Sequence, residues 1–544
     1  MEQSLKKNEI YDAVIDGYTA EGMGVARING MAVFIPFSAR GDSLRVKIVK
    51  VGRSFAYGRI EEMLSPSPYR VTPECPAFGK CGGCAFMHLD YEEELRLKGQ
   101  RVTDALRRIG GFDIEVGPAE PSDRRGYRNK AQFLPCRGEN GTEFGFYRAR
   151  SHQVVSCGGR CMIQGAASNE LARAVCRWMD ELDVRPYDEE SRSGLVRHIY
   201  VREGAGGCLL CIVANGKSLP GLPRLVQLAC EARGDLKGVV LNINTEHTNR
   251  IMGDKCVTLW GEGELRDELM GLEFRLSPMS FYQVNHPQAE RLYQAALDAA
   301  GLTESDTALD LYCGAGTITL LLARRCGRAI GSEIVPQAVE NARESAVRNG
   351  IDNVEFILGD AGQAADMLAR EGLCPDVIVT DPPRKGMDEL AADAICRMGP
   401  KKVVYISCDP ASLARDCARL AKGGYTVASA RAFDMFPGTA NVETVVLLSK
   451  GEVDSKKIRV EFSLEDMDMS EFQDGATYTQ IKDYVLEHTG LKVSSLYISQ
   501  IKRKCGIGVG KNYNLPKSED SRQPQCPPEK EKAIREAFKY FGMI

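Results

Sequence analysis

The strongest constraint on the fold is an alternation of apolar runs and helical stretches in the second half of the chain. The apolar runs occupy residues 307–312, 328–332, 353–358, 376–380 and 402–407. Repeated strand–helix units of this length form a parallel, doubly wound sheet, and a last apolar run at Thr444–Leu448 adds a closing strand. Because the carboxyl ends of parallel strands face a ligand crevice, we expect functional residues where these runs end.

The first half of the chain is organised differently. Residues 8–62 contain short alternating runs broken by glycines, which predicts a small β-barrel. Residues 65–68 are a linker by composition, and the region from 65 to 280 mixes helical and strand patterns, so we expect an α+β domain there.

The end of the chain is the one clearly basic block. Residues 451–475 are acidic and weakly patterned, which favours a linker, whereas residues 476–544 carry 12 Lys and Arg against 7 Asp and Glu. Apolar periodicity predicts helices at 476–487, 495–504 and 529–541, an arrangement that resembles a helix-turn-helix unit. We expect either a packing appendage or an accessory RNA-binding module in which Lys502, Arg503, Lys504 and Lys511 contact phosphates.

Overall charge and hydropathy exclude some classes of protein. With 70 Lys and Arg against 74 Asp and Glu, bulk charge gives no argument for coating nucleic acid, although a local basic strip could bind it. No apolar run approaches the roughly 18 residues of a membrane helix, and the N-terminus lacks the apolar core of a signal peptide. We therefore expect a cytoplasmic chain with no membrane partner, whose 19 cysteines are reduced thiols, metal ligands or nucleophiles.

A glycine turn follows the first strand of the alternating region. Residues 310–317 read D-L-Y-C-G-A-G-T, and glycines at a strand end let the backbone approach a ligand beside the free amides of the next helix. The dinucleotide fingerprint needs a third glycine where Thr319 stands, so NAD is disfavoured. Glu333 ends the second strand, where a carboxylate can accept both hydroxyls of a ribose. An ordinary turn with a solvated acid is the alternative, but the combination of a strand, a glycine turn and an acid at the end of the second strand favours S-adenosylmethionine.

Two later strand ends carry polar motifs, T-D-P-P-R-K-G at residues 380–386 and Y-I-S-C-D-P at residues 405–410. Most cysteines in a chain like this are small buried apolar residues. Cys408 differs because it joins a strand end, a helix start and polar neighbours, and we expect the helix dipole to favour its thiolate. Cys408 is therefore the candidate nucleophile.

Three cysteines near the start of the second region have a ligand-like spacing. Cys75, Cys81 and Cys84 form C-x5-C-x2-C, and either Cys161 or Cys157 could complete a set of four. By spacing alone, zinc and an iron–sulfur cluster are equally good interpretations, since both take four thiolates. Unligated core cysteines are the third possibility.

Together these motifs resemble the RNA (uracil-5-)-methyltransferases. Six motifs occur in the order of that family, over roughly residues 8–450. They are the glycine turn at 310–317, the two strand-end motifs at 380–386 and 405–410, M-F-P-G-T-A-N-V-E at 435–443, S-F-Y-Q-V-N at 280–285 and Y-R-N-K at 127–130. In the first region, E-G-M-G-V-A-R followed by V-F-I-P-F resembles a TRAM domain, an RNA-binding barrel. One departure is Asn441, which stands where the family usually has His, two residues before Glu443.

The resemblance implies a multidomain α/β protein. We expect an OB-like TRAM barrel at residues 1–64, a central α+β domain with an iron–sulfur cluster at 65–280, a Rossmann-like class I methyltransferase domain at 281–450, a linker at 451–475 and a small helical extension at 476–544.

The resemblance also implies roles for individual residues. Cys408 corresponds to the nucleophile that adds to carbon 6 of uracil, and Glu443 to the base that removes the proton from carbon 5. The positions that would hold S-adenosylmethionine are Gln283, Tyr312, Gly314, Gly316, Glu333, Asp360 and Asp381. The pattern C-x5-C-G-G-C with a distant cysteine is similar to that of cluster-bearing members, which implies a 4Fe-4S cluster on Cys75, Cys81, Cys84 and Cys161.

RNA is the expected partner, and no obligate protein partner is inferred. Family members with both a TRAM domain and a cluster act mostly on large-subunit ribosomal RNA, so 23S ribosomal RNA is favoured and transfer RNA is the alternative. A non-catalytic RNA-binding or chaperone protein is a rival that Cys408 and Glu443 oppose. A radical enzyme is a second rival, but it usually needs a C-x3-C-x2-C triplet that this chain does not contain.

Overall fold

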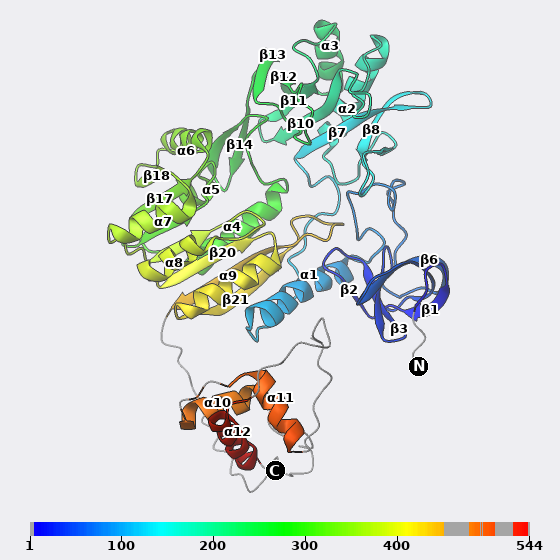
Figure 1. Ribbon diagram of the computed structural model, residues 1–544. Coiled ribbons are helices and arrows are strands. Elements are labelled where there is room, and N and C mark those ends of the chain that lie inside the picture. Colours follow the sequence, from blue (N-terminus) through cyan, green and yellow to red (C-terminus); the bar gives the residue numbers. More distant parts are fainter. Residues whose placement is uncertain (1–4, 451–477, 490, 492, 506–525, 542–544) are drawn as a thin grey trace. The chain divides into compact units, whose positions relative to one another are not determined.

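The computed structural model describes residues 5–450, 478–489, 491, 493–505 and 526–541. The chain divides into two compact units, Met1–Glu452 and Val453–Ile544, and the expected linker at 451–475 lies outside the described residues. Figure 1 shows the successive sheets of the first unit and, separately, the helices of the second unit. None of the helices in the described ranges combines the length and apolarity that crossing a bilayer requires.

The N-terminal part is a six-stranded sheet in the order β1-β5-β6-β4-β3-β2. Side chains alternate along its strands, so that Leu44, Val46 and Ile48 of one strand point into a shared apolar core. This agrees with the small β domain expected over residues 8–62. The strands are β1 (Ile10–Val14), β2 (Gly17–Tyr18), β3 (Gly24–Ile28), β4 (Met31–Ile35), β5 (Ser43–Val51) and β6 (Phe55–Ser65).

The central part is a seven-stranded sheet in the order β13-β12-β11-β10-β7-β8-β9, packed against two helices. These helices are α2 (Ala166–Glu181) and α3 (Leu222–Ala232). Two residues after α2, Asp183 adopts a left-handed φ of 49°, which ends the helical run. The strands are β7 (Lys130–Gly138), β8 (Gly141–Tyr147), β9 (Val154–Ser156), β10 (Val196–Gly204), β11 (Gly207–Ala214), β12 (Leu236–Ile243) and β13 (Lys255–Gly261).

The third sheet has seven strands in the order β18-β17-β16-β19-β20-β22-β21. Its first five strands are parallel, as the alternation of apolar runs and helical stretches predicts. The closing strand β22 runs antiparallel to both of its neighbours, β20 and β21. The strands are β16 (Thr307–Leu311), β17 (Arg328–Glu333), β18 (Val354–Leu358), β19 (Val377–Thr380), β20 (Lys402–Ser407), β21 (Tyr425–Phe433) and β22 (Glu443–Lys450), and a hairpin of β14 (Leu265–Leu269) and β15 (Leu272–Leu276) precedes them.

Helices cover both faces of this sheet and bury an apolar core on each. One face packs against α4 (His286–Ala300), α5 (Thr317–Ala323) and α6 (Pro336–Arg348), and the other against α7 (Ala361–Arg370), α8 (Glu389–Met398) and α9 (Pro410–Lys422). With both faces covered, only the strand ends remain available to a ligand.

The described part of the second unit contains α10 (Tyr478–Thr489), α11 (Ser495–Lys504) and α12 (Pro528–Tyr540). These helices share their own apolar core, in which Ile481, Ile501 and Phe538 are fully buried. The basic end of α11 is partly used inside this unit, because Lys502 is buried and Lys504 pairs with Glu531 at 2.6 Å. Burial disfavours the expected phosphate contact of Lys502, whereas Lys504 remains 57% exposed, and Lys511 lies outside the described residues.

A buried ion triad joins distant parts of the first unit. Helix α1 (Tyr91–Ala105), which ends in the π-helical turn η1 (Leu106–Gly110), carries Lys98, whose side chain is 1% exposed. The ammonium donates to Glu94 at 2.8 Å and to Asp434 at 2.5 Å, and Glu94 also accepts the backbone N–H of Gly438 at 2.6 Å. The triad thus fastens the loop between β21 and β22 to α1.

Replacing Lys98 with Met should lower the free energy of unfolding by about 3–5 kcal/mol, because the buried Asp434 loses its cation and the buried Glu94 keeps only Arg124, at 3.5 Å. Urea unfolding followed by circular dichroism measures the change. Lys401→Met is the matched control: its ion pair with Asp376 leaves the lysine 78% exposed, and its loss should cost less than about 1 kcal/mol. Adding Glu94→Gln and Asp434→Asn to Lys98→Met should recover part of the loss. Equal effects of the two lysine substitutions would contradict a stabilising role of the triad.

Candidate active site

The parallel register of the third sheet aligns the ends of its strands. Leu311 of β16 lies opposite Ser332 of β17 on one side and Thr380 of β19 on the other. The next residues along these strands, Tyr312, Glu333 and Asp381, therefore emerge side by side at the carboxyl edge. Asp360 follows β18 at the same edge, so four of the expected cofactor-binding residues come from four neighbouring strands.

The turn after β16 has the backbone that a close approach requires. Gly314 and Gly316 have left-handed φ angles of 55° and 83°, and Tyr312 has a φ of 71°. A positive φ is costly for a side chain as large as tyrosine, and such strain concentrates at functional sites. The carboxylate of Glu333 crosses to this turn, accepting the N–H groups of Gly314 at 3.0 Å and Val335 at 2.9 Å. The turn and the second strand are thereby fixed relative to each other.

Asp310 is a polar residue of this site that the sequence analysis did not single out. The hydroxyl of Thr319 donates to its Oδ2 at 2.6 Å, while its Oδ1 is buried without a partner. Burial raises the pKa of Asp310 to about 8. Threonine at the place of a third glycine therefore serves as the hydrogen-bond donor to a buried acid. Asp310 was visible as an acid inside an apolar strand directly before the glycine turn.

The remaining expected cofactor residues reach the same edge. Burial raises the pKa of Asp381 to about 7. Asp360 caps α7, with its Oδ1 accepting the N–H of Gly362 at 3.1 Å. Gln283 lies on the segment before α4, where its side chain hydrogen-bonds the buried phenol of Tyr293, and the charges of Asp381 and Glu443 act on that phenol. The structure thus brings together the cofactor residues expected from the sequence.

Cys408 and Glu443 face each other across two antiparallel strands. Ser407 of β20 pairs with Thr444 of β22, so the next position places Cys408 opposite Glu443. The Cα atoms of directly opposed residues in such a pair lie roughly 4.5–5.5 Å apart. Glu443 is 4% exposed, and burial followed by the charge of Asp381 raises its pKa well above the usual value.

The expectation that the helix start favours the thiolate of Cys408 is wrong for the free protein. Burial, and next the negative charge of Glu443, raise the pKa of Cys408 to about 11. A helix dipole supplies only about half a charge, which is less than the effect of burial and a neighbouring carboxylate. The resting thiol is therefore protonated.

Arg384 is the cation at this site, and the sequence analysis assigned it no role. Its guanidinium lowers the pKa values of both Cys408 and Glu443, and it hydrogen-bonds the thiol. It also donates to the side-chain oxygen of Asn441 at 3.3 Å. Its place three residues after Asp381, in a loop at a strand end, is the signal that could have identified it.

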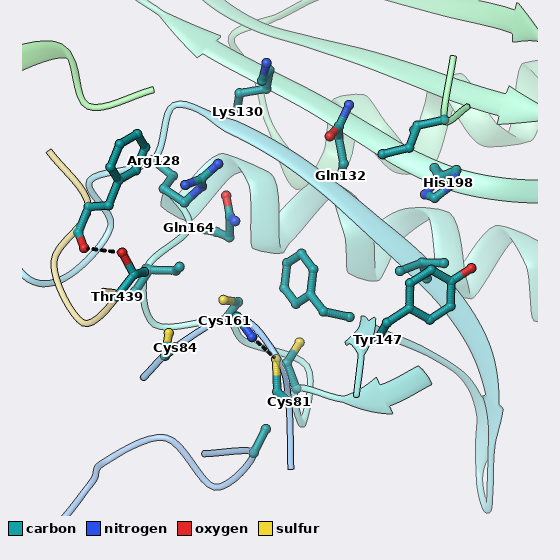
Figure 2. A pocket seen from close by; sticks show the side chains of 18 of the residues that line it. Cys81, Cys84, Arg128, Lys130, Gln132, Tyr147, Cys161, Gln164, His198 and Thr439 are labelled. Carbon is teal, nitrogen blue, oxygen red and sulfur yellow. Dashed lines mark hydrogen bonds between the residues drawn. The ribbon is translucent and has the colours of Figure 1, made fainter. Parts of the chain in front are cut away.

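The cysteines of the expected metal site line one cavity of about 680 Å³. Figure 2 shows Cys81, Cys84 and Cys161 at one side of this cavity. Burial and then the charges of Cys161, Cys81 and Cys75 raise the pKa of Cys84 to about 12, so these four thiols act on one another. Over the described ranges, no group of three or more His, Cys, Asp or Glu side chains is arranged to hold a metal ion.

Cys157 and Cys161 have different surroundings. The thiol of Cys157 is buried and donates to the carbonyl oxygen of Phe144 at 3.2 Å. Cys161 instead receives hydrogen bonds from the backbone amides of Ile163 and Gln164, which act to lower its pKa, although burial raises the net value to about 11. Amide donors stabilise a thiolate, whereas a carbonyl acceptor stabilises a thiol.

Comparisons with known proteins agree with the sequence resemblance. The family model for tRNA (uracil-5-)-methyltransferases matches residues 262–451, and the TRAM domain model matches residues 5–60. A protein of Halalkalibacterium halodurans described as an uncharacterized RNA methyltransferase is 41% identical over 82% of this chain and 98% of its own length. A protein of Clostridium acetobutylicum with the same description is 38% identical over 82% of this chain and 98% of its own length.

A solved structure has the same fold over most of the chain. It is a Pyrococcus abyssi tRNA (uracil-54, C5)-methyltransferase in complex with S-adenosyl-L-homocysteine, and it matches 80% of this chain and 99% of its own with a TM-score of 0.64 and 26% identity.

Proposed function

The chain belongs to the RNA (uracil-5-)-methyltransferase family, and we propose that it methylates carbon 5 of a specific uridine in 23S ribosomal RNA. The observation that carries this proposal is the placement of Cys408 opposite Glu443 at the edge that also presents the glycine turn. Ribosomal RNA is favoured because family members that combine a TRAM domain with such a cysteine set act mostly on large-subunit ribosomal RNA. Transfer RNA is the second candidate, because the enzyme in the matching solved structure is described as a tRNA methyltransferase.

The methyl donor in this proposal is S-adenosylmethionine, which supplies an electrophilic methyl group on a positively charged sulfur. The carboxyl edge of the third sheet suits such a molecule, because it carries the glycine turn and the carboxylates of Glu333 and Asp360. Directly beneath this edge, the buried Asp310 Oδ1 and Thr380 Oγ1 lack hydrogen-bond partners. Glu333 would accept the ribose hydroxyls, and Asp360 would meet the adenine. The other residues that would contact the methyl donor are Tyr312, Gly314, Gly316, Asp381 and Gln283.

Cys408 and Glu443, at the same edge of the sheet, suit the activation of uracil. Carbon 5 of uracil is a poor nucleophile, so the thiolate of Cys408 first bonds to carbon 6, and the electron pair of the ring double bond moves to an enolate oxygen. After carbon 5 gains the methyl group, Glu443 removes the proton from that carbon. The carbon–sulfur bond then breaks, the ring double bond re-forms and the thiolate leaves. Arg384 provides the positive charge that ionisation of Cys408 and Glu443 needs.

The cysteine set in this proposal holds a 4Fe-4S cluster. Zinc and an iron–sulfur cluster both take four thiolates. The resemblance of C-x5-C-G-G-C with a distant cysteine to cluster-bearing family members favours the cluster, and the charges of Cys161, Cys81 and Cys75 act on Cys84. The ligands would be Cys75, Cys81, Cys84 and Cys161. Cys157 is not included because its thiol donates a hydrogen bond to the carbonyl oxygen of Phe144.

The first experiment maps 5-methyluridine in total RNA from cells that lack the protein. A single 5-methyluridine in 23S ribosomal RNA should disappear and return with the wild-type gene, but not with Cys408→Ala, which lacks the nucleophile. Cys374→Ala is the matched control, since this cysteine of the same domain is exposed. Restoration by Cys408→Ala would contradict the proposed mechanism, and loss of the modification from tRNA instead would favour the second candidate.

Glu443→Gln should trap a covalent protein–RNA adduct, because methylation can proceed while removal of the proton from carbon 5 is slowed. A band of reduced mobility in a denaturing gel, sensitive to ribonuclease, detects it. The control is Glu389→Gln, which removes an 82% exposed carboxylate of the same domain and should turn over normally. Full turnover by Glu443→Gln without an adduct would remove Glu443 from the role of base.

Protein purified without air should be brown and contain about four irons per chain. Cys161→Ala should lose most of this iron, whereas Cys157→Ala should retain it, because the amides of Ile163 and Gln164 donate to Cys161, while the thiol of Cys157 donates to a carbonyl oxygen. Metal analysis and the visible absorption spectrum provide the measurements. Stoichiometric zinc without iron would contradict the cluster, and equal iron loss in both variants would contradict the choice of Cys161.

A further inference from the structure

The cavity that holds the cysteines has a second, cationic part formed by strand β7. Alternate residues of this strand, Lys130, Gln132 and Leu134, line the cavity, while Ala131 and Phe133 between them are fully buried in the core. Figure 2 shows Lys130 and Gln132 projecting in the same direction from the strand, at the side of the view away from the cysteines. This part of the cavity is not used by the proposed cluster.

Lys130 has no counter-charge in the described part of the chain, and its ammonium forms no hydrogen bond there. The charged groups that face it are both cations, Arg202 on the neighbouring strand β10 and Arg128 before β7. Burial, then these two cations, lower the pKa of Lys130 to about 8. A half-buried cation among cations is unfavourable unless an anion binds there.

Other groups of the cavity point to the same ligand chemistry. Arg128 and Arg384 also line it, and within the described ranges neither lies at ion-pairing distance from a carboxylate. The lining contains one carboxylate, Glu189, which already pairs with Arg197 at 3.5 Å.

Two buried polar side chains of the lining also lack partners. Gln164 is 5% exposed with an unpartnered Oε1, and His198 is 7% exposed with an unpartnered Nδ1. Buried polar atoms are normally hydrogen-bonded, so this cavity has both the charge and the polar groups for an anionic, hydrogen-bonding ligand.

We propose that Lys130 binds a phosphodiester of the RNA strand next to the uridine that reacts with Cys408. The same cavity is lined by Arg384 and Asn441, and Arg384 contacts the thiol of Cys408, so an RNA strand passing the reactive thiol would lie along it. The inference rests on the proposed function for the identity of the strand, but the anion site itself can be tested without methylation.

The test measures the affinity of the full-length protein for a 12-nucleotide oligouridylate as a function of salt concentration. Loss of one phosphate contact should make the slope of log K against log salt shallower by about 0.7. Lys130→Ala should show this change and Lys130→Arg should not. The control, Lys217→Ala, removes an exposed lysine of the same region and should leave the slope unchanged.

The same binding should depend on pH in a way that identifies Lys130. An anion raises the pKa of the ammonium above its free value of about 8, so binding takes up a proton at alkaline pH. From pH 7 to pH 9 the affinity should fall by up to about tenfold in the wild type. In Lys130→Arg this loss should be absent, because guanidinium remains charged throughout the range.

Three results would overturn the proposal: no binding of the oligonucleotide by the wild type in 50 mM salt, an unchanged slope in Lys130→Ala, or an equal change in Lys217→Ala. A wild-type protein that methylates no RNA, yet shows the slope change on loss of Lys130, would refute the proposed function while supporting the anion site.

Discussion

The parallel register of the third sheet is the constraint on which the rest of the site depends. Strands β16, β17, β18 and β19 each place one residue at a common edge only because their hydrogen bonds align Leu311 with Ser332 and with Thr380. A shift of one residue in any strand would turn its terminal side chain to the opposite face. Helices on both faces fix this register by burying apolar side chains on each side.

The other half of the chemistry needs a second constraint, because Glu443 comes from an antiparallel strand that begins after a loop. This loop is held from outside the sheet. Lys98 and Glu94 of α1 bind Asp434 and Gly438, and the backbone amides of Ala85 and Phe86, directly after Cys84, donate to the carbonyl oxygen of Gly438 at 2.8 and 2.9 Å. The segment that follows Cys84, one of the proposed cluster ligands, therefore also positions the loop that leads to the proposed base. In this way the cysteine set would influence where Glu443 lies without contacting it.

The parts of this molecule that were predictable from sequence are those with a local pattern. Apolar runs located the strands, and the rule that ligands bind at carboxyl ends then located Cys408, Glu333 and Asp381. The buried triad was not predictable, because Lys98 and Asp434 are 336 positions apart and a charged residue in an amphipathic helix is usually exposed. The state of the Cys408 thiol was also missed, since it depends on burial and on Glu443 across the sheet rather than on the helix that follows. The sequence identified Lys130 only as part of the Y-R-N-K motif, because the absence of a counter-charge is a property of tertiary structure.

The balance of charge at the catalytic edge bears on when the thiol becomes reactive. Asp310, Asp381, Glu443 and Cys408 all have raised pKa values, and burial is the first cause for each of them. Arg384 is the cation that lowers the pKa values of Cys408 and Glu443, so a second positive charge bound in the crevice would favour ionisation of all four groups together. A sulfonium ion carries such a charge. Glu443 and Asp381, which raise the pKa of Cys408 in the free protein, are therefore among the groups on which the proposed methyl donor would act.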